Sequence, residues 1–237
     1  WGKGPEGKLR QLQVMRAELP GLKSGMVEKK REFLNTVEDP RQLARLLAIP
    51  DKRWRRATSG KLSPARSLVA AQLSLLIDIV TAVPLRLKNL SSLNFRNNLS
   101  WPRGPKGPAL LFVPGSEMKN GEDYQAELTA DLARRLLDYR DKLAPPVIGS
   151  VPQDLFVTRH GKLKAMATIA AEFKQIIARE LGISMTLHQA RHLAAKVMLD
   201  SNPDAYPLVQ QLLGHQNLSS TVKAYAGVNT RRASRHY

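Results

Sequence analysis

The chain has 237 residues, and its 43% apolar content is enough for the core of one large domain or of one domain with a small appendage. Lys and Arg number 37 against 20 Asp and Glu, which gives a net charge of +17 and a sequence pI near 10.4. This charge predicts a surface that binds a polyanion. The absence of cysteine excludes disulfides, thiolate nucleophiles and cysteine-based zinc sites. No signal-peptide pattern and no run of about eighteen apolar residues is present, which argues against membrane insertion.

The first part of the chain differs from the rest. Residues 1–35 are basic and helix-prone, with a break at Leu19-Pro20-Gly21, and we expect them to be a connector or the tail of a preceding domain. The main domain is expected to span residues 36–237. Because the first residue is Trp1 rather than Met, we expect the chain to be a fragment of a longer protein.

A short helix and a basic segment open the main domain. Asp39 before Pro40 predicts a helix start, and Pro50 is expected to end that helix. The segment DKRWRRA at 51–57 then surrounds one tryptophan with basic residues, among them Arg53, Arg55 and Arg56. It is either a solvated surface turn or a contact to a DNA backbone, and the sequence favours neither.

The most apolar helix of the chain follows. Ser63 before Pro64 predicts its start, and it is expected to run to about Thr81 as the central buried helix because it is apolar nearly all round. Just beyond its end, Arg86 stands between leucines that must be buried, so it needs a strong partner or an anionic ligand. A buried ion pair is the alternative, although Asp78 and Asp123 do not obviously supply it.

Three strand candidates come next, at 94–101, 109–113 and 124–128, and they predict a small antiparallel sheet. The Pro/Gly-rich link between the first two carries Lys106, which we group with the three arginines as a DNA contact. The Asn120-Gly121 pair is a hairpin signal that puts Lys119 at a hairpin tip, where it either faces solvent or reaches a cleft. Beyond the sheet the pattern predicts a helix capped by Thr129, a loop at 143–153, a short strand at 154–157 and a long amphipathic helix ending near Leu181.

The stretch 186–225 groups the chemically useful residues. TLHQARHLAAKVML predicts a helix that places His188 and Arg191 one turn apart, beside an apolar stripe of Leu187, Ala190, Ala194, Val197 and Met198. A second helix starting after Asn202 ends at Gly214, so that His215 follows the stop. A short last helix capped by Ser219 carries Tyr225.

Taken one at a time, these residues have plain structural explanations: a satisfied histidine on a helix, or a core tyrosine with a solvated hydroxyl. Three of the five histidines nevertheless fall in this stretch, and no carboxylate lies between Thr186 and Asp200. A site rich in donors and poor in carboxylates suits an anion, most plausibly a phosphate.

From about Asp39 to the end, the chain resembles the catalytic domain of tyrosine recombinases, the phage-integrase and bacterial recombinase family. HQAR is similar to the His-x-x-Arg box of that family, LLGH to its Leu-Gly-His box, and the tyrosine after a Ser/Thr-rich turn to its nucleophile box. There are three departures. Val83-Pro84-Leu85 precedes Arg86 where the family has a Thr-Gly-Leu-like turn. Asn89 follows Arg86 by three residues where the family has Glu, and Tyr225 lies ten residues after His215, one more than the familiar spacing. Family members commonly carry a separate helical DNA-binding domain before the catalytic one, and residues 1–35 are then its end.

The resemblance implies an α+β, mostly helical fold, the tyrosine-recombinase catalytic fold with a small antiparallel β-sheet. It also implies attack by Tyr225 on a phosphodiester of double-stranded DNA, which gives a 3′-phosphotyrosyl link, by a protein that assembles on DNA as a dimer or tetramer in a bacterial or phage-infected cytoplasm. The implied roles suit the residue types. Arg86, Arg191 and His215 hold the phosphate, His188 accepts the tyrosine proton, and Lys119 protonates the leaving 5′ oxygen. No cofactor or metal is implied, and the sequence contains no carboxylate cluster suited to Mg²⁺.

Three other functions stay open on the sequence: a type IB topoisomerase that relaxes DNA, a non-catalytic DNA-binding protein of the same fold, and a basic RNA- or ribosome-binding protein. The short chain and the compact spacing from His188 to Tyr225 favour the recombinase over the topoisomerase. The last two would explain the charge but not the set of six residues.

Overall fold

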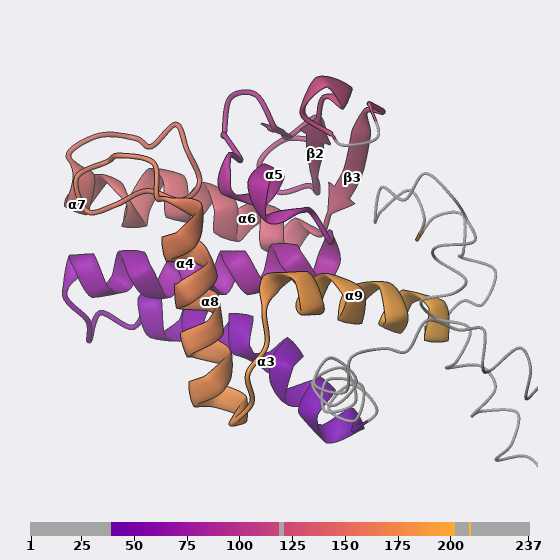
Figure 1. Ribbon diagram of the computed structural model, residues 1–237. Coiled ribbons are helices and arrows are strands. Elements are labelled where there is room, and N and C mark those ends of the chain that lie inside the picture. Colours follow the sequence, from indigo (N-terminus) through magenta and orange to yellow (C-terminus); the bar gives the residue numbers. More distant parts are fainter. Residues whose placement is uncertain (1–38, 119–120, 202–208, 210–237) are drawn as a thin grey trace, which may run out of the picture. The chain divides into compact units, whose positions relative to one another are not determined.

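Helices make up most of the described chain, with a small antiparallel sheet beside them (Figure 1), as the sequence predicts. The structure is a computed structural model in which residues 39–118, 121–201 and 209 are described. The elements are α3 (Pro40–Ala57), α4 (Pro64–Ala82), α5 (Leu87–Ser91), β1 (Leu99–Ser100), β2 (Ala109–Val113), the 3-10 helix η1 (Gly115–Glu117), β3 (Tyr124–Leu128), α6 (Ala130–Asp138), the π-helix η2 (Tyr139–Leu143), α7 (Pro145–Ile148), α8 (Met166–Leu181) and α9 (Leu187–Ser201).

Helix α4 lies at the centre of the fold, and α3, α6, α8 and α9 all pack against it (Figure 1). Ser63 precedes it and Pro64 occupies its first turn, because proline has no N–H to lose there. Leu73 and Leu76 are 7% and 1% exposed, which confirms the prediction of a buried central helix. By length and composition α4 is apolar enough to cross a membrane, but 67% of that stretch is buried inside the protein, as in the core helix of a folded domain.

Helix α3 continues through Pro50, so the prediction that this proline ends the helix is wrong. A proline inside a helix removes one hydrogen bond and costs about 3 kcal/mol or more. Two features offset that cost. Pro50 is buried together with Leu46 and Ile49, and its carbonyl accepts a hydrogen bond of 2.7 Å from the Ser74 hydroxyl on α4. Packing on α4 therefore overrides the local stop signal, and residues 51–57 form the last two turns of α3 rather than a surface turn.

The sheet has the order β1-β2-β3, and β2 and β3 have the predicted bounds. They are antiparallel, with Ala109 opposite Leu128 and Val113 opposite Tyr124. The first strand is much shorter than predicted, because the Asn94 side chain accepts hydrogen bonds from the backbone N–H groups of Arg96 and Asn97 and so starts a turn. Only Leu99–Ser100 remain to pair with β2.

The two ends of the β2–β3 connection lie close together at Gly115 and Gly121. A side chain on Gly115 would place a Cβ 2.4 Å from the Gly121 carbonyl oxygen, so only glycine fits there. The Gly115 N–H donates to the Asp123 carboxylate at 2.7 Å. Lys119 and Asn120 lie outside the described residues, so the structure does not test Lys119 as the hairpin tip.

The segments that follow the sheet agree with the sequence except in two places. Thr129 caps α6 by accepting a hydrogen bond from Leu132 N, and α8 is the predicted amphipathic helix. The predicted loop at 143–153 is partly helical, since η2 and α7 extend from α6. The predicted strand at 154–157 forms only two single bridges, Asn94–Asp154 and Val157–Leu163, because neither partner is an extended strand.

Helices α3, α4 and α6 are joined by an ionic cluster centred on Arg135. Its guanidinium lies 2.5 Å from the carboxylates of Asp51 and Asp131 and 3.5 Å from that of Asp78, and it also covers the Trp54 ring. Asp78 is therefore the third carboxylate around one cation. Burial raises the pKa of Asp78 to about 6, because the loss of hydration outweighs the attraction of Arg135.

Asp78→Asn is expected to stabilise the fold at neutral pH. In the unfolded chain Asp78 loses its proton near its ordinary pKa of 3.8, whereas in the folded state it keeps the proton up to about pH 6. As pH rises from about 4 to about 6, this difference lowers the free energy of unfolding. Asparagine mimics the protonated form and removes that loss, which amounts to at most about 3 kcal/mol. Urea unfolding of both proteins at pH 4 and pH 7 measures the difference, and the variant should gain on the wild type only at the higher pH. A variant less stable than wild type at pH 7 would show that the pair with Arg135 outweighs burial.

Candidate active site

Arg86 is placed by the end of the central helix. After α4 the chain turns through Val83 and Pro84, and Arg86 becomes the residue before the first turn of α5. Of the two leucines that flank it, Leu85 is buried as predicted, whereas Leu87 is only half-buried. The two carboxylates considered as partners of Arg86 have contacts of their own. Asp78 pairs with Arg135, and the Asp123 carboxylate accepts a hydrogen bond from the Gly115 N–H.

Asn89, the residue at which the sequence departs from the family pattern, has a structural role in this region. It is 3% exposed, and its side-chain amide donates to the carbonyl of Glu117 in η1 at 3.0 Å. This bond ties α5, and with it the backbone beside Arg86, to the β2–β3 connection. An amide can make this donation, whereas a glutamate in its ionised form only accepts.

Helix α9 starts with a reciprocal cap that the sequence interpretation overlooked. The Gln189 side chain accepts hydrogen bonds from the N–H and the hydroxyl of Thr186, and the Thr186 hydroxyl accepts one from Gln189 N. This is a capping box, and its signal, Thr-x-x-Gln before an apolar run, is visible in the sequence. It fixes the first turn of α9, from which His188 projects, with Arg191 one turn later.

Arg86, His188 and Arg191 come together although about a hundred residues separate the first from the other two. Arg191 is 6% exposed, which is unusual for an arginine. Burial lowers the pKa of His188, and the nearby guanidinium groups of Arg191 and then Arg86 lower it further. The two fixed positive charges thus favour the neutral form of the imidazole, although the ring remains exposed to solvent. Such a site can hold an anion with the arginines and accept a proton on the histidine.

His192, one turn after His188, belongs to the same cluster. The Nε2 atoms of the two rings lie 3.1 Å apart, and the rings meet edge to face with centroids 4.5 Å apart. His192 is half-buried on the same side of α9. The sequence interpretation noted it only as one of the histidines in this stretch, although its spacing of four residues from His188 indicates a shared helix face.

Tyr124, the first residue of β3, also lies at the site. It is 3% exposed, and its buried hydroxyl makes no hydrogen bond within the described ranges 39–118, 121–201 and 209. Burial raises the pKa of this phenol, and the positive charge of Arg191 opposes the rise, which places the ring near that arginine. No sequence signal marks it, because strand alternation predicts only that its side chain faces inward.

The remaining catalytic candidates, Lys119, His215 and Tyr225, lie outside the described residues, as do the helix predicted from Asn202 and the short last helix. Of that region the structure describes Val209 alone, which is helical and buried. In the described ranges there is no group of three or more His, Cys, Asp or Glu side chains suited to a metal ion.

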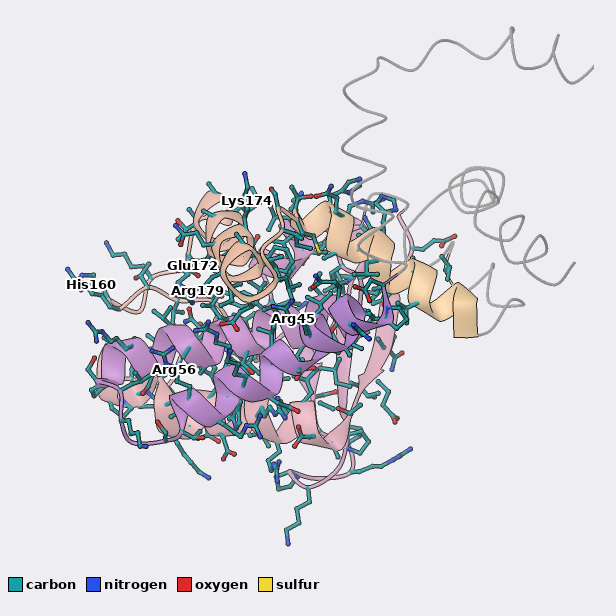
Figure 2. The ribbon with its side chains drawn as sticks, turned by 90° about the horizontal axis from the view of Figure 1, so that it is seen from below. Arg45, Arg56, His160, Glu172, Lys174 and Arg179 are labelled. Atoms are coloured by element: carbon teal, nitrogen blue, oxygen red, sulfur yellow. The ribbon has the colours of Figure 1, made fainter. Side chains whose placement is uncertain are left out.

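The four residues proposed as DNA contacts differ in their surroundings. Arg55, Arg56 and Lys106 are exposed. Arg53 is instead buried, with its guanidinium paired to Glu180 of α8, which Lys52 also contacts at 2.7 Å. Figure 2 shows Arg45 and Arg56 of α3 and Arg179 of α8 on the side of the molecule that faces the viewer. Only Arg55, Arg56 and Lys106 of the four proposed DNA contacts are therefore exposed enough to reach DNA. Arg53 instead joins α3 to α8.

Solved structures of recombinases share this fold. A crystal structure of the XerH site-specific recombinase bound to difH substrate gives a TM-score of 0.60 and 20% identity over 78% of this chain and 49% of that one. A crystal structure of XerA recombinase gives a TM-score of 0.52 and 18% identity over 77% of this chain and 62% of that one. The fold is therefore that of tyrosine recombinases, as the resemblance implied.

Sequence comparison then gives the family. The model of the phage integrase family matches residues 39–232, and the chain belongs to that family. Tyrosine recombinase XerA of Pyrococcus horikoshii is 28% identical over 171 residues, and tyrosine recombinase XerC of Pseudomonas savastanoi pv. phaseolicola is 39% identical over 72 residues. These matches cover 50% and 24% of the two relatives, so the chain spans half or less of their length.

Proposed function

We propose that the chain is the catalytic domain, 36–237, of a site-specific DNA recombinase or integrase that cleaves and rejoins DNA through a 3′-phosphotyrosyl intermediate. The observation that carries the proposal is that Arg86, His188 and Arg191 lie close together, with Arg191 buried. A non-catalytic DNA-binding protein has no need to bury an arginine beside a second one and a histidine, since exposed charges suffice to hold a backbone. Residues 1–35 are proposed to be the end of a preceding DNA-binding domain.

In the proposed reaction the phosphate is held first. The guanidinium groups of Arg86 and Arg191 bind the non-bridging oxygens, and His215 adds a further hydrogen bond. The negative charge that develops on the five-coordinate phosphorus then meets donors that are already in place, so little reorganisation is needed.

Proton transfer completes the chemistry. The Tyr225 hydroxyl, with an ordinary pKa near 10, loses its proton to His188 as its oxygen attacks phosphorus. The 5′ oxygen leaves and takes a proton from Lys119. The phosphotyrosyl bond retains the energy of the broken phosphodiester, so a 5′ hydroxyl can reverse the reaction without a nucleotide cofactor, and no step calls for a metal ion.

The partner in this proposal is double-stranded DNA, on which the protein assembles as a dimer or tetramer. The net charge of +17 supports it, as does the XerH structure, in which that protein is bound to its DNA substrate. Because a member of this family acts on DNA, we propose the cytoplasm of a bacterial or phage-infected cell as its location.

Covalent trapping on DNA with a nick near the cleavage site tests the function. Cleavage there releases a short strand that diffuses away, so the phosphotyrosyl complex accumulates and is seen as a band that resists denaturation. Random-sequence nicked duplexes, screened as a pool, provide the substrate. Relaxation of supercoiled plasmid without a partner site would favour the topoisomerase instead, and DNA binding with no covalent complex on any duplex of the pool would contradict the catalytic proposal.

Binding to duplex DNA should weaken steeply as salt is added. Neutralising about six phosphates releases counterions and gives a slope near −5 in a plot of log affinity against log salt concentration. Fluorescence anisotropy between 50 and 200 mM NaCl measures the slope, with Lys106→Ala expected to reduce it by about one unit. Binding that barely changes over this range would rule out an interface that follows the DNA backbone.

A further inference from the structure

The His188–His192 pair has the geometry of a two-ligand metal site. The sequence HQARH places the two residues four apart on α9, the spacing that lets two imidazoles on one helix face share a zinc ion. Their Nε2 atoms are 3.1 Å apart. Zinc–nitrogen bonds of about 2.1 Å to two atoms at that separation enclose an angle of about 95°, which lies within the range that a four- or five-coordinate ion accepts.

We propose that His188 and His192 together chelate a divalent transition metal ion of the zinc class, and that this ion inhibits the protein by occupying His188. Two protein nitrogens leave the other coordination positions to water or to an anion. The site is thus open, unlike a structural zinc site with four protein ligands.

The surrounding charges select the class of metal. The guanidinium groups of Arg86 and Arg191 lie near His188 and repel any cation. Mg²⁺ and Ca²⁺ prefer oxygen ligands and gain nothing from imidazole, so this repulsion excludes them. Zn²⁺, Ni²⁺ and Cu²⁺ bind imidazole strongly enough to offset it. The same arginines favour an anion as the next ligand, which reduces the net charge of the bound complex.

Metal binding and proton transfer compete for the same atom. A ring nitrogen that donates its lone pair to zinc cannot accept a proton from a phenol, so the bound form has lost the proposed base. This inhibition rests on the proposed function, whereas the metal site itself rests on the two rings alone and is tested without DNA.

Isothermal titration of the protein with Zn²⁺ tests the site directly. Wild-type protein should bind one ion through this pair, and His192→Gln should weaken that binding roughly tenfold or more because the second ligand no longer acts from a fixed position. His160→Gln is the matched control. His160 is an exposed histidine on the loop before α8, apart from α9 (Figure 2), and its loss should leave the binding unchanged. Titration with Mg²⁺ should give no saturable heat.

The outcomes are distinct. Zinc affinity that is equal in wild type and His192→Gln, or absent from wild type, overturns the proposal. A second measurement guards against misfolded variants: ¹⁵N spectra of the wild-type histidine rings should show zinc shifting Nε2 of His188 and His192 and leaving His160 unmoved. If zinc binds the pair but covalent trapping on DNA is unaffected, the metal site stands and the role of His188 as base is wrong.

Discussion

Changing Tyr225 to phenylalanine should abolish covalent attachment to nicked DNA and leave DNA affinity nearly unchanged. Only the hydroxyl is removed, and the ring that remains has almost the same volume, so packing and backbone contacts persist. Denaturing gels of the trapping reaction measure the first quantity, and anisotropy with the same duplex measures the second.

Two other tyrosines serve as controls for this assignment. Tyr206 precedes Pro207, and Tyr237 is the last residue of the chain. Tyr206→Phe and Tyr237→Phe are expected to keep full covalent attachment. A complex that forms in Tyr225→Phe but disappears in either of these variants would move the nucleophile to that residue.

Arg191→Ala should lower the rate of covalent attachment by at least about a hundredfold, the loss seen when one fixed donor is removed from a comparable transition-state site. Arg191 is buried beside His188 and Arg86, so it acts where water screens its charge poorly. Arg191→Lys keeps the charge but loses the planar fork, and it should recover only part of the rate. Single-turnover kinetics on the nicked substrate provide the measurement.

The burial of Arg191 requires a control for folding, because its removal also leaves space in the interior. Thermal unfolding and anisotropy should show a folded protein that still binds DNA. Arg56→Ala removes an exposed arginine from the same molecule and should slow attachment far less. Equal rates for Arg191→Ala and wild type would exclude Arg191 from the reaction.

The sequence predicts those parts of the fold in which local signals agree with tertiary packing. Ser63-Pro64 and the all-round apolarity beyond it give α4 to within a residue, and alternation with an Asn-Gly turn gives β2 and β3. The resemblance to the recombinase family also brings Arg86 and Arg191 into one hypothesis, and the structure places both near His188.

The errors occur where a distant contact decides the local structure. Pro50 stays inside a helix because it packs on α4 and Ser74 supports its carbonyl, and no local pattern reports that contact. Arg53 is buried because Glu180, on a helix more than a hundred residues later, meets its guanidinium. On α9, the predicted apolar stripe includes Ala194 and Val197, which are only half-buried, and omits Leu193 and Ala195, which are buried. The covered face of the helix is therefore wider than a single stripe.

Of the proposed catalytic residues, the structure places Arg86, His188 and Arg191 close together, whereas Lys119, His215 and Tyr225 lie outside the described residues. The sequence does not predict the arrangement of the site. Tyr124 enters it through the register of β3, and His192 through the distance between two rings, and neither quantity can be obtained from residue order. The cap that fixes this end of α9, Thr186 with Gln189, was present in the sequence as a pattern.

Two of the polar side chains buried in α4, those of Gln72 and Ser74, also bear on the site. A helix that is apolar on every side can rotate about its axis in an apolar core at little cost, and a shift of one residue turns it by about 100°. Gln72 prevents this by donating to the Tyr139 hydroxyl and the Val157 carbonyl, and Ser74 does so by donating to Pro50. Only Val83, Pro84 and Leu85 separate Arg86 from the end of α4, so these three bonds fix the rotation of the helix from which the backbone of Arg86 continues. The orientation of the proposed phosphate-binding arginine thus depends on the core, and we expect substitutions at Gln72 to affect the proposed cleavage as well as stability.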